Sequence, residues 1–354
     1  MEVTLSAAQD AANRFAIQGS VREVTEHPGG KIHASFVVMA GSRRYLLQNV
    51  NTHVFTQPEL VMENVAAVTA HLVSHGERTP AVIGTREGGM LWRDETGGIW
   101  RMFEFIDRAT TMETARGTAE AERAAAAFGR FQRVLADYAG PALHVTIPAF
   151  HDTSARLAAL DQAIEAAPPE RRERAQPVTA ALETLRSEYA GFFGSAAERK
   201  GATGIAHHDA KIANVLFDSR TGEALCVVDF DTVMPGPLLV DFGDLVRSMA
   251  TSAAEDERDA AGIAAEPVRY GAITRGYLRH MADRLTEEDR SQMPMFGETM
   301  VFEQTVRFVT DYLDGDRYYR VTRAEQNLDR AWAQLSLLRS LREQHATFSR
   351  LVRR

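Results

Sequence analysis

The chain has 354 residues, of which 45% are hydrophobic and 25% charged, and its formal net charge is −8. This composition is ordinary for a globular protein, and the length suits two lobes better than one compact core. Because the 40 Lys and Arg are scattered along an acidic chain, there is no general electrostatic reason for it to bind nucleic acid or anionic membranes.

Residues 1–20 contain Glu2, Asp10 and Arg14 and no continuous apolar segment, which argues against a secretory signal. No stretch approaches the ~20 apolar residues that span a bilayer, so we expect a cytoplasmic protein without a membrane partner. A single cysteine, Cys226, excludes an internal disulfide. Its apolar neighbours favour a small buried side chain over a nucleophile.

The first ~105 residues are predicted to be rich in β-structure, with one long helix. The helix is expected over 57–75, where apolar residues recur at helical spacing and Gly76 ends the pattern. Turns are expected at Pro28-Gly29-Gly30, at Gly41-Ser42 and at 94–98, the last as a hairpin. Strands are expected at 21–26, 32–39, 45–50, 81–83, 90–92 and 99–105.

Beyond Phe105 the composition changes to that of a helical protein. Helices are expected at 113–136, 154–166, 174–197, 266–283, 297–313 and 323–351. The strands predicted in this half are 215–217 and 224–230, joined by a tight turn, and 252–267 is expected to be a loop or a frayed helix. We therefore predict an α+β, protein-kinase-like two-lobe fold. Its β-rich nucleotide-binding lobe would span 1–105, and its helical catalytic and substrate-binding lobe would span 106–354.

The segment HHDAKIANVLFD at 207–218, followed by VVDFDTVMPG at 227–236, carries the predicted chemistry. Asp209 and Asn214 stand five positions apart, and a hairpin then leads to Asp229, which is the layout of a kinase active site. Asp209 would accept the proton of the attacking hydroxyl, while Asn214 and Asp229 would hold Mg²⁺ on the phosphates of ATP. Lys211 is placed to reach the transferring phosphate.

The other polar residues of this region allow more than one interpretation. Asp231 could be a second metal carboxylate, or it could hold the substrate or the loop. Asp241 and Asp244 are expected to brace the catalytic loop or to cap a helix. His207 and His208 are expected to be structural.

Nucleotide binding is predicted to involve the first lobe. The Gly29-Gly30 turn is a candidate for covering the phosphates with backbone N–H groups. Gln48 stands on the strand where a protein kinase keeps its phosphate-binding Lys, so either Lys31 or Lys211 compensates or nucleotide binding is weaker. Residues 103–106 would form the hinge, with Glu104 and Ile106 binding adenine through their backbone. Core packing is an equal alternative for Phe103 and Phe105.

The catalytic segment resembles the aminoglycoside phosphotransferase and choline kinase superfamily, and within it the N-acetylhexosamine 1-kinases. The resemblance extends to RYLLQNVNTHVF at 44–55, FHDT at 150–153, MPGPLLVDFGDLVR at 234–247 and RFVTDYLDGDRYY at 307–319. It implies Asp209 as the base, Asn214 and Asp229 as magnesium ligands, and Arg307 and Tyr318 as sugar contacts. Gln48 is also found in that group, so its presence does not indicate an inactive enzyme.

One departure from the group lies in the first turn, where Lys31 takes the place of a His and His33 that of an Asn. If these positions touch the sugar, the substrate would be another hexose, an anionic sugar or a cyclitol. The leading hypothesis is an ATP- and Mg²⁺-dependent sugar 1-kinase acting on an N-acetylhexosamine, as a monomer or homodimer. The alternatives are a kinase for another small hydroxyl compound, such as an aminoglycoside, and a nucleotide-binding pseudokinase. An aminoglycoside kinase needs a cluster of acids, which Asp311, Asp314 and Asp316 could supply.

Overall fold

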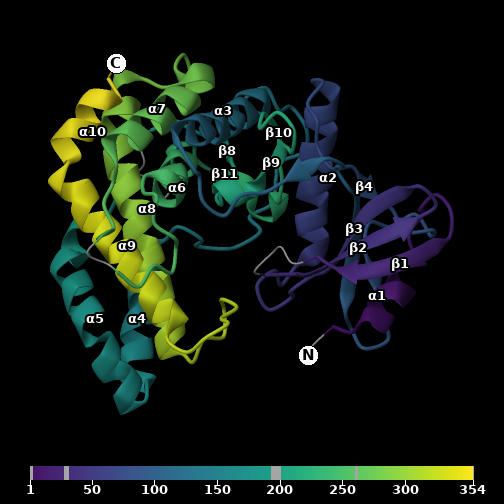
Figure 1. The fold of residues 1–354 in the computed structure, drawn as a ribbon, viewed down its shortest axis with the longest axis horizontal. Helices are drawn as coiled ribbons and strands as arrows, with labels where there is room; N and C mark the ends of the chain where they lie inside the picture. The colour runs from purple at the N-terminus through teal and green to yellow at the C-terminus, as the bar shows by residue number, and fades with distance from the viewer. Residues whose placement is uncertain (1–2, 28–31, 193–200, 260–261, 354) are drawn as a thin grey trace.

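The computed structural model describes residues 3–27, 32–192, 201–259 and 262–353. A β-sheet with one short helix forms one end of the molecule, and a larger set of helices forms the other (Figure 1). This is the predicted two-lobe α+β arrangement. The turn proposed to cover the phosphates, with Gly29, Gly30 and Lys31, lies outside the described residues.

The small lobe is built on a six-stranded antiparallel sheet in the order β1-β2-β3-β6-β4, with β5 paired to β6. Buried and less buried residues largely alternate along β2 and β3. The buried side chains of these strands pack with α1 in a small core. The elements are α1 (Leu5–Ala12), β1 (Val21–Glu26), β2 (Ala34–Ala40), β3 (Arg43–Asn49), β4 (Val82–Ile83), β5 (Trp92–Arg93) and β6 (Ile99–Glu104).

The long helix α2 (Pro58–Ser74) lies between the two lobes (Figure 1). Its apolar side chains, among them Val61, Val65 and Leu72, belong to the large core shared with the helical lobe, whereas β2, β3 and β6 pack in a separate core with α1. The buried amide of Asn64 bonds the carbonyls of His144 and Val233, which lie in the other lobe. The helix therefore ties the sheet to the catalytic segment.

Three short ladders organise the catalytic segment. Strands β9 (Val215–Asp218) and β10 (Ala224–Val227) form the expected hairpin, and β7 (Ala109–Thr110), in the connection between the lobes, adds a third strand beside β9. Strand β8 (Thr203–Ala206) pairs with β11 (Met234–Pro237). Because β8 leads into His207 and β11 follows Asp231, this pair holds the two functional loops together.

The remaining elements are helical and pack around the large core. They are α3 (Thr118–Leu135), α4 (Thr153–Ala166), α5 (Pro169–Tyr189), α6 (Leu239–Met249), α7 (Pro267–Met281), α8 (Glu287–Leu313), α9 (Gln326–Glu343) and α10 (His345–Leu351), with one-turn 3₁₀ segments η1 (Ile212–Asn214) and η2 (Phe230–Thr232). In the described part of the chain, no helix combines the length and apolar character that crossing a bilayer would require.

Several predicted boundaries were wrong. The expected helix 323–351 is two helices, since α9 ends before Gln344 and α10 begins at His345. Helix α8 begins ten residues before the predicted start, because Thr286 and Asp289 form a capping box and Pro294 is tolerated inside the helix. Strand β10 ends at Val227, and Asp229 adopts a left-handed conformation with φ of 68° instead of extending the strand. Helices α1 and α6 and strands β7, β8 and β11 were missed.

Helices α3 and α7 cross closely because glycine occupies the contact. A Cβ atom added to Gly276 would lie 2.2 Å from the carbonyl oxygen of Glu122, well inside van der Waals contact. Gly271, one and a half turns earlier on the same helix, has only ordinary contacts at 3.5 Å and beyond.

We expect Gly276→Ala to lower the free energy of unfolding by about 1–3 kcal/mol, because the two helices must separate to admit the methyl group. Gly271→Ala is the matched control, and it should be neutral or stabilising by up to ~1 kcal/mol through helix propensity. Urea unfolding of both variants measures the difference. Equal stability of the two would contradict the close crossing.

Candidate active site

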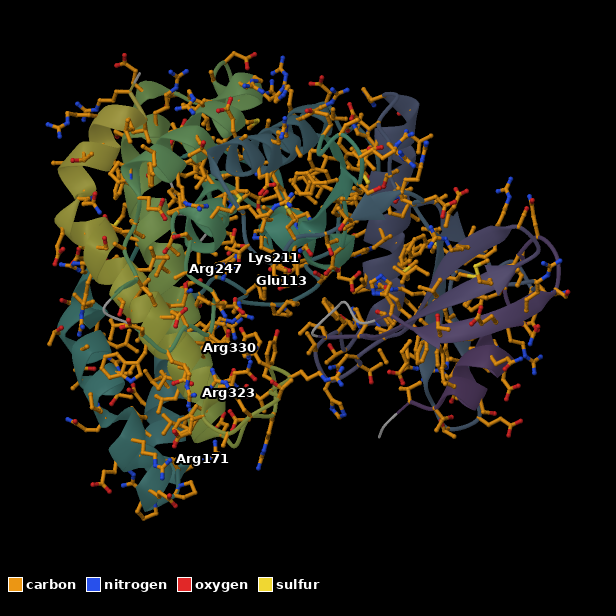
Figure 2. The ribbon with its side chains drawn as sticks, in the orientation of Figure 1. Glu113, Arg171, Lys211, Arg247, Arg323 and Arg330 are labelled. Carbon is orange, nitrogen blue, oxygen red and sulfur yellow. The ribbon has the colours of Figure 1, made fainter. Side chains whose placement is uncertain are left out.

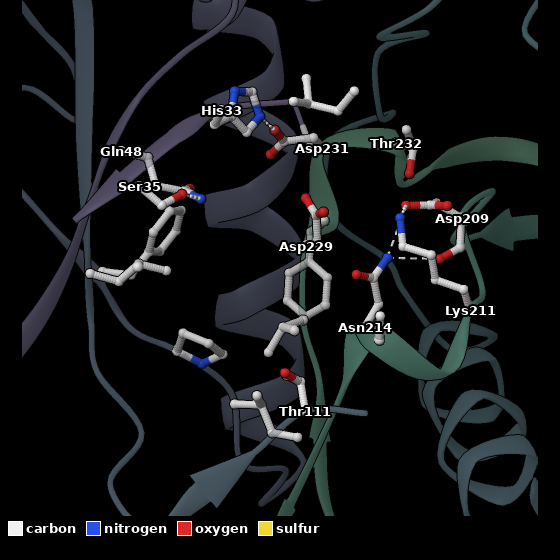
Figure 3. A pocket seen from close by; sticks show the side chains of 18 of the residues that line it. His33, Ser35, Gln48, Thr111, Asp209, Lys211, Asn214, Asp229, Asp231 and Thr232 are labelled. Atoms are coloured by element: carbon white, nitrogen blue, oxygen red, sulfur yellow. Dashed lines mark hydrogen bonds and ion pairs between the residues drawn. The ribbon is translucent and has the colours of Figure 1, made fainter. Parts of the chain in front are cut away.

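A cavity of about 520 Å³ lies between the sheet and the helical lobe. Its walls come from strands β2, β3 and β6, from the loops that carry Asp209 and Asp229, and from helix α8. A volume of this size accommodates small-molecule ligands. Figure 3 shows that Asp209, Asn214 and Asp229 face this space from the helical lobe, while Gln48 and His33 face it from the sheet.

The loop between β8 and β9, residues 207–214, carries Asp209 and is called the catalytic loop here. It is held in place by a buried carboxylate. Asp241, at the start of α6, accepts the backbone N–H groups of His207 and His208, each at 2.8 Å, and the side-chain amide of Gln132. Burial raises the pKa of Asp241, while the neighbouring imidazole of His207 and these donors oppose the rise. His208 has φ of 65°, a conformation that is costly for a non-glycine residue and that the anchored loop maintains. The bracing role predicted for Asp241 is therefore seen.

Within this loop, Asp209 is bonded by Lys211 and Asn214. The Lys211 ammonium lies 2.7 Å from Asp209 Oδ2, and the Asn214 amide nitrogen donates to the same oxygen and to the Asp209 carbonyl, each at 2.9 Å. Desolvation alone would raise the pKa of Asp209, but the Lys211 charge outweighs it and holds the pKa well below its usual range. Asp209 is therefore ionised and able to accept a proton.

Asp229 lacks such a partner. Among the described residues, no Lys, Arg or His nitrogen lies within 4.0 Å of its carboxylate. Desolvation and the nearby carboxylates of Asp231 and Asp209 raise the pKa of Asp229. Since the nitrogen of the Asn214 amide is committed to Asp209, its oxygen is turned towards Asp229 (Figure 3). One neutral oxygen and one uncompensated carboxylate therefore face the same space.

Asp231 links the two lobes. Its carboxylate is bound by both ends of the Arg101 guanidinium, at 2.5 and 2.8 Å, and by His33 Nε2 at 2.7 Å. The backbone N–H of Asn51 donates to His33 Nδ1, so the proton of the neutral imidazole is on Nε2 and points to Asp231. Although burial opposes it, the Arg101 charge holds the pKa of Asp231 well below its usual range. Sequence analysis considered Asp231 but did not identify its partner Arg101.

Gln48, where a protein kinase would have lysine, is bonded within the sheet. Its amide donates to Ser35 Oγ at 3.1 Å and accepts from Arg101 Nε at 3.0 Å. Either Lys31 or Lys211 was expected to compensate for the missing lysine charge, or nucleotide binding to be weaker. Lys211 is paired with Asp209, and Lys31 lies outside the described residues. At the hinge, Glu104 N–H and Phe105 N–H donate to the carbonyls of Ala81 and Arg44, and both Glu104 and Ile106 line the cavity.

The predicted sugar contacts, Arg307 and Tyr318, come together at the helical end of the cavity. The Arg307 guanidinium lies 5.1–5.7 Å from the ring centres of Phe150, Tyr318 and Tyr319. No carboxylate of the described residues lies within 4.0 Å of it. Arg307 therefore brings a positive charge, held among aromatic rings, to the side of the cavity away from the sheet.

Two of the acids considered for an aminoglycoside site, Asp311 and Asp316, form internal hydrogen bonds beside the cavity. Asp311 accepts three backbone N–H groups, those of Arg317, Tyr318 and Tyr319. Asp316 is bonded by Arg171 and Asn327, and none of the three acids lines the cavity. Arg171, the partner of Asp316, lies far from Lys211, the partner of Asp209 (Figure 2). Asp311 therefore holds the backbone of Tyr318 in place, and Asp311, Asp314 and Asp316 all lie outside the cavity lining.

A model of the phosphotransferase enzyme family matches residues 23–280, more than half of the chain. The chain belongs to the phosphotransferase enzyme family. The matched region begins inside β1, includes the rest of the sheet, the loop that carries Asp209 and the β9–β10 hairpin, and ends in α7.

Solved structures share the fold over nearly the full length. A microcompartment-associated aminopropanol kinase is 17% identical, with a TM-score of 0.61 and coverage of 98% of this chain and 99% of its own. Spectinomycin phosphotransferase, in complex with ADP and spectinomycin, is 12% identical, with a TM-score of 0.58 and coverage of 99% and 98%. A choline kinase from Streptococcus pneumoniae is 12% identical, with a TM-score of 0.54 and coverage of 91% and 94%. At these identities the likeness establishes the fold.

The residues around Asp229 fit the divalent metal that a phosphotransferase uses. In the described chain no group of three or more His, Cys, Asp or Glu side chains forms a metal cluster by itself. Magnesium does not need one, because it takes one or two carboxylates and fills the remaining positions with phosphate oxygens and water. The raised pKa of Asp229 and the free oxygen of Asn214 match that requirement.

Removal of the Asp241 carboxylate should disorder the catalytic loop. We expect Asp241→Ala to lower the free energy of unfolding by about 2–4 kcal/mol, because the buried N–H groups of His207 and His208 lose their acceptor. Asp244→Ala on the same helix, where the carboxylate binds Arg247 and no loop backbone, is the comparison. Hydrogen exchange at 207 and 208 distinguishes them, and equal protection in both variants would contradict the anchoring role.

Proposed function

We propose that this protein transfers the γ-phosphoryl group of ATP to a hydroxyl of a small neutral or anionic sugar, with Mg²⁺ as cofactor. The anomeric hydroxyl of an N-acetylhexosamine is the leading acceptor. The observation that carries the proposal is the arrangement of Asp209, Asn214 and Asp229 on one wall of the cavity. A residue that accepts the proton of the acceptor hydroxyl and residues that hold the metal are among the parts that recur in phosphoryl-transfer sites.

Asp209 is proposed as the catalytic base. Its Oδ2 is occupied by Lys211 and Asn214, so the carboxylate is fixed in orientation and Oδ1 is left to accept the proton of the acceptor hydroxyl. Lys211, bonded to the same carboxylate, is placed to meet the phosphoryl group as it moves between donor and acceptor. Magnesium, held by Asn214 and Asp229, would neutralise the charge that develops on the phosphate oxygens.

The lobe spanning 1–105 is proposed to hold the nucleotide, and 106–354 the acceptor. In the hinge, the N–H groups of Glu104 and Phe105 are used within the sheet, and Ile106 N–H has no acceptor among the described residues. Ile106 N–H is therefore the group proposed to donate to adenine, and the Glu104 carbonyl the one to accept from it. Apolar side chains beside them, among them Leu46 and Phe103, would cover the ring faces.

The positive charge of Arg307 favours a neutral or anionic acceptor over a cationic one. A guanidinium already occupies the aromatic cluster of Phe150, Tyr318 and Tyr319, where an ammonium ligand would otherwise gain cation–π contacts. The carboxylates of the nearby Asp311 and Asp316 accept hydrogen bonds from within the protein, and neither lines the cavity. Hydroxyl, carbonyl or carboxylate oxygens would pair with Arg307, so a sugar or cyclitol fits better than an aminoglycoside or choline.

We expect Asp209→Asn to reduce turnover by about 10²–10⁴-fold, the usual contribution of a positioned general base, while MgATP binding stays within about twofold of wild type. Coupled detection of ADP release across hexoses, hexosamines, N-acetylhexosamines, cyclitols and aminoglycosides provides the assay. Asp283→Asn, the same substitution at an exposed helix end, is the control. Near-normal turnover of Asp209→Asn would remove Asp209 as the base.

We expect Arg307→Ala to raise the KM for the acceptor by about 10–100-fold through loss of a charge-assisted contact, with a much smaller change in the KM for ATP. Arg307→Lys keeps the charge without the planar fork and should show an intermediate effect. Steady-state kinetics with each substrate varied in turn measure both constants. A parallel rise in the two KM values would argue against an acceptor contact.

A further inference from the structure

We propose that Arg101 is the cation by which the small lobe binds the phosphates of the nucleotide. It would act from strand β6 in place of the lysine that Gln48 replaces on β3. This inference rests on the proposed function, because it assigns a role within the same nucleotide site.

The sheet register puts Arg101 beside the lysine position. Gln48 pairs with Arg101 across β3 and β6, and with Ser35 across β3 and β2. All three residues line the cavity, so they form one row of polar side chains across the sheet. A cation on the adjacent strand of this row reaches the same part of the cavity as one on β3, because neighbouring strands are about 5 Å apart.

Gln48 orients the guanidinium. Its oxygen accepts from Arg101 Nε at 3.0 Å, while its nitrogen is held by Ser35. The remaining two nitrogens of the fork are thereby directed across the cavity to Asp231, two residues after the proposed metal ligand Asp229. The Arg101 side chain is only 2% exposed, and the Asp231 carboxylate compensates its charge. Gln48 thus becomes a positioning residue for Arg101.

The other Lys and Arg residues that line the cavity come from the helical lobe. Among the described lining residues, Arg101 is the one Lys or Arg that the small lobe contributes. Lys211 is bonded to Asp209, and Arg247 to Asp244 and Glu255. Arg307 lies among the aromatic rings at the acceptor end. No other described cation is therefore placed to meet the nucleotide phosphates from the sheet side.

Asp231 holds the Arg101 guanidinium in an orientation suited to binding a phosphate. Arginine binds carboxylates and phosphates with the same bidentate geometry, so the Asp231 carboxylate keeps Arg101 ready in the absence of nucleotide. His33 bonds Asp231 from the other side at 2.7 Å. When Arg101 turns to a phosphate, the carboxylate therefore retains one partner, and the exchange leaves no isolated buried charge.

The test separates phosphate binding from the structural role of the pair. Calorimetric affinities for ATP, ADP and adenosine are measured in EDTA, so that metal coordination does not contribute. They are compared in Asp231→Asn and in Asp231→Asn/Arg101→Gln. Both variants have already lost the ion pair, and they differ only in the cation. Loss of Arg101 should weaken ATP binding by about 10–100-fold and leave adenosine binding unchanged.

A second pair of variants keeps the test decisive if the double variant does not fold. Arg101→Lys keeps a cation opposite Asp231 and should weaken ATP binding by about 3–10-fold, again without effect on adenosine. Gln48→Lys/Arg101→Gln moves the cation to β3 and keeps Asp231, and it should bind ATP more tightly than the single variant Arg101→Gln.

Equal losses for ATP and adenosine, or no loss for either, would overturn the role of Arg101. Failure of the wild-type protein to bind ATP even with Mg²⁺ would instead reject the proposed function.

Discussion

The site depends on one electrostatic constraint, which is that three carboxylates, those of Asp209, Asp229 and Asp231, face a single cavity. Neighbouring like charges repel strongly where protein replaces water, and Asp231 and Asp209 raise the pKa of Asp229, so each carboxylate must be compensated or protonated. Asp209 is compensated by Lys211 from its own loop, and Asp231 by Arg101 and His33 from the other lobe. Asp229 is left with a raised pKa, and no Lys, Arg or His nitrogen of the described residues lies within 4.0 Å of its carboxylate. A cation bound there, as proposed for Mg²⁺, would relieve the repulsion that raises this pKa.

This distribution explains why the catalytic loop is anchored so firmly from behind. A carboxylate that binds Lys211 and Asn214 at once, and that also faces two other acids, needs a backbone that does not relax away from the repulsion. Asp241 provides it through the N–H groups of His207 and His208, and Thr232 bonds the His207 carbonyl from the second loop. The ladder of β8 with β11 joins the same two loops. The strain at His208 and Asp229 is therefore maintained by contacts outside the cavity.

Local features of this architecture could be predicted from the sequence, and features that depend on distant pairing could not. The spacing of Asp209, Asn214 and Asp229 and the hairpin between them are encoded within about 25 residues, so the pattern was visible. Strands β8 and β11 were missed because TGIA and MPGP are short and contain glycine or proline, and neither alternates apolar with polar residues. Asp311 was read as a candidate ligand because its backbone partners become apparent only once the loop at 315–319 is folded.

Arg101 shows the same limit in a form that bears on function. In the sequence it is one arginine in an apolar strand, and Gln48, 53 positions earlier, looks like the loss of a needed lysine. The register of β3 against β6 brings the two together and reverses that interpretation. An amide on β3 would be a poor substitute for lysine if it had to bind phosphate, but it is well suited to hold Nε of an arginine and leave the rest of the fork free. Placing an arginine on β6 also requires a carboxylate opposite it. An unpaired guanidinium that is only 2% exposed would strongly destabilise the fold. Gln48, Arg101 and Asp231 therefore make physical sense only as a set, in which each residue supplies what the other two lack.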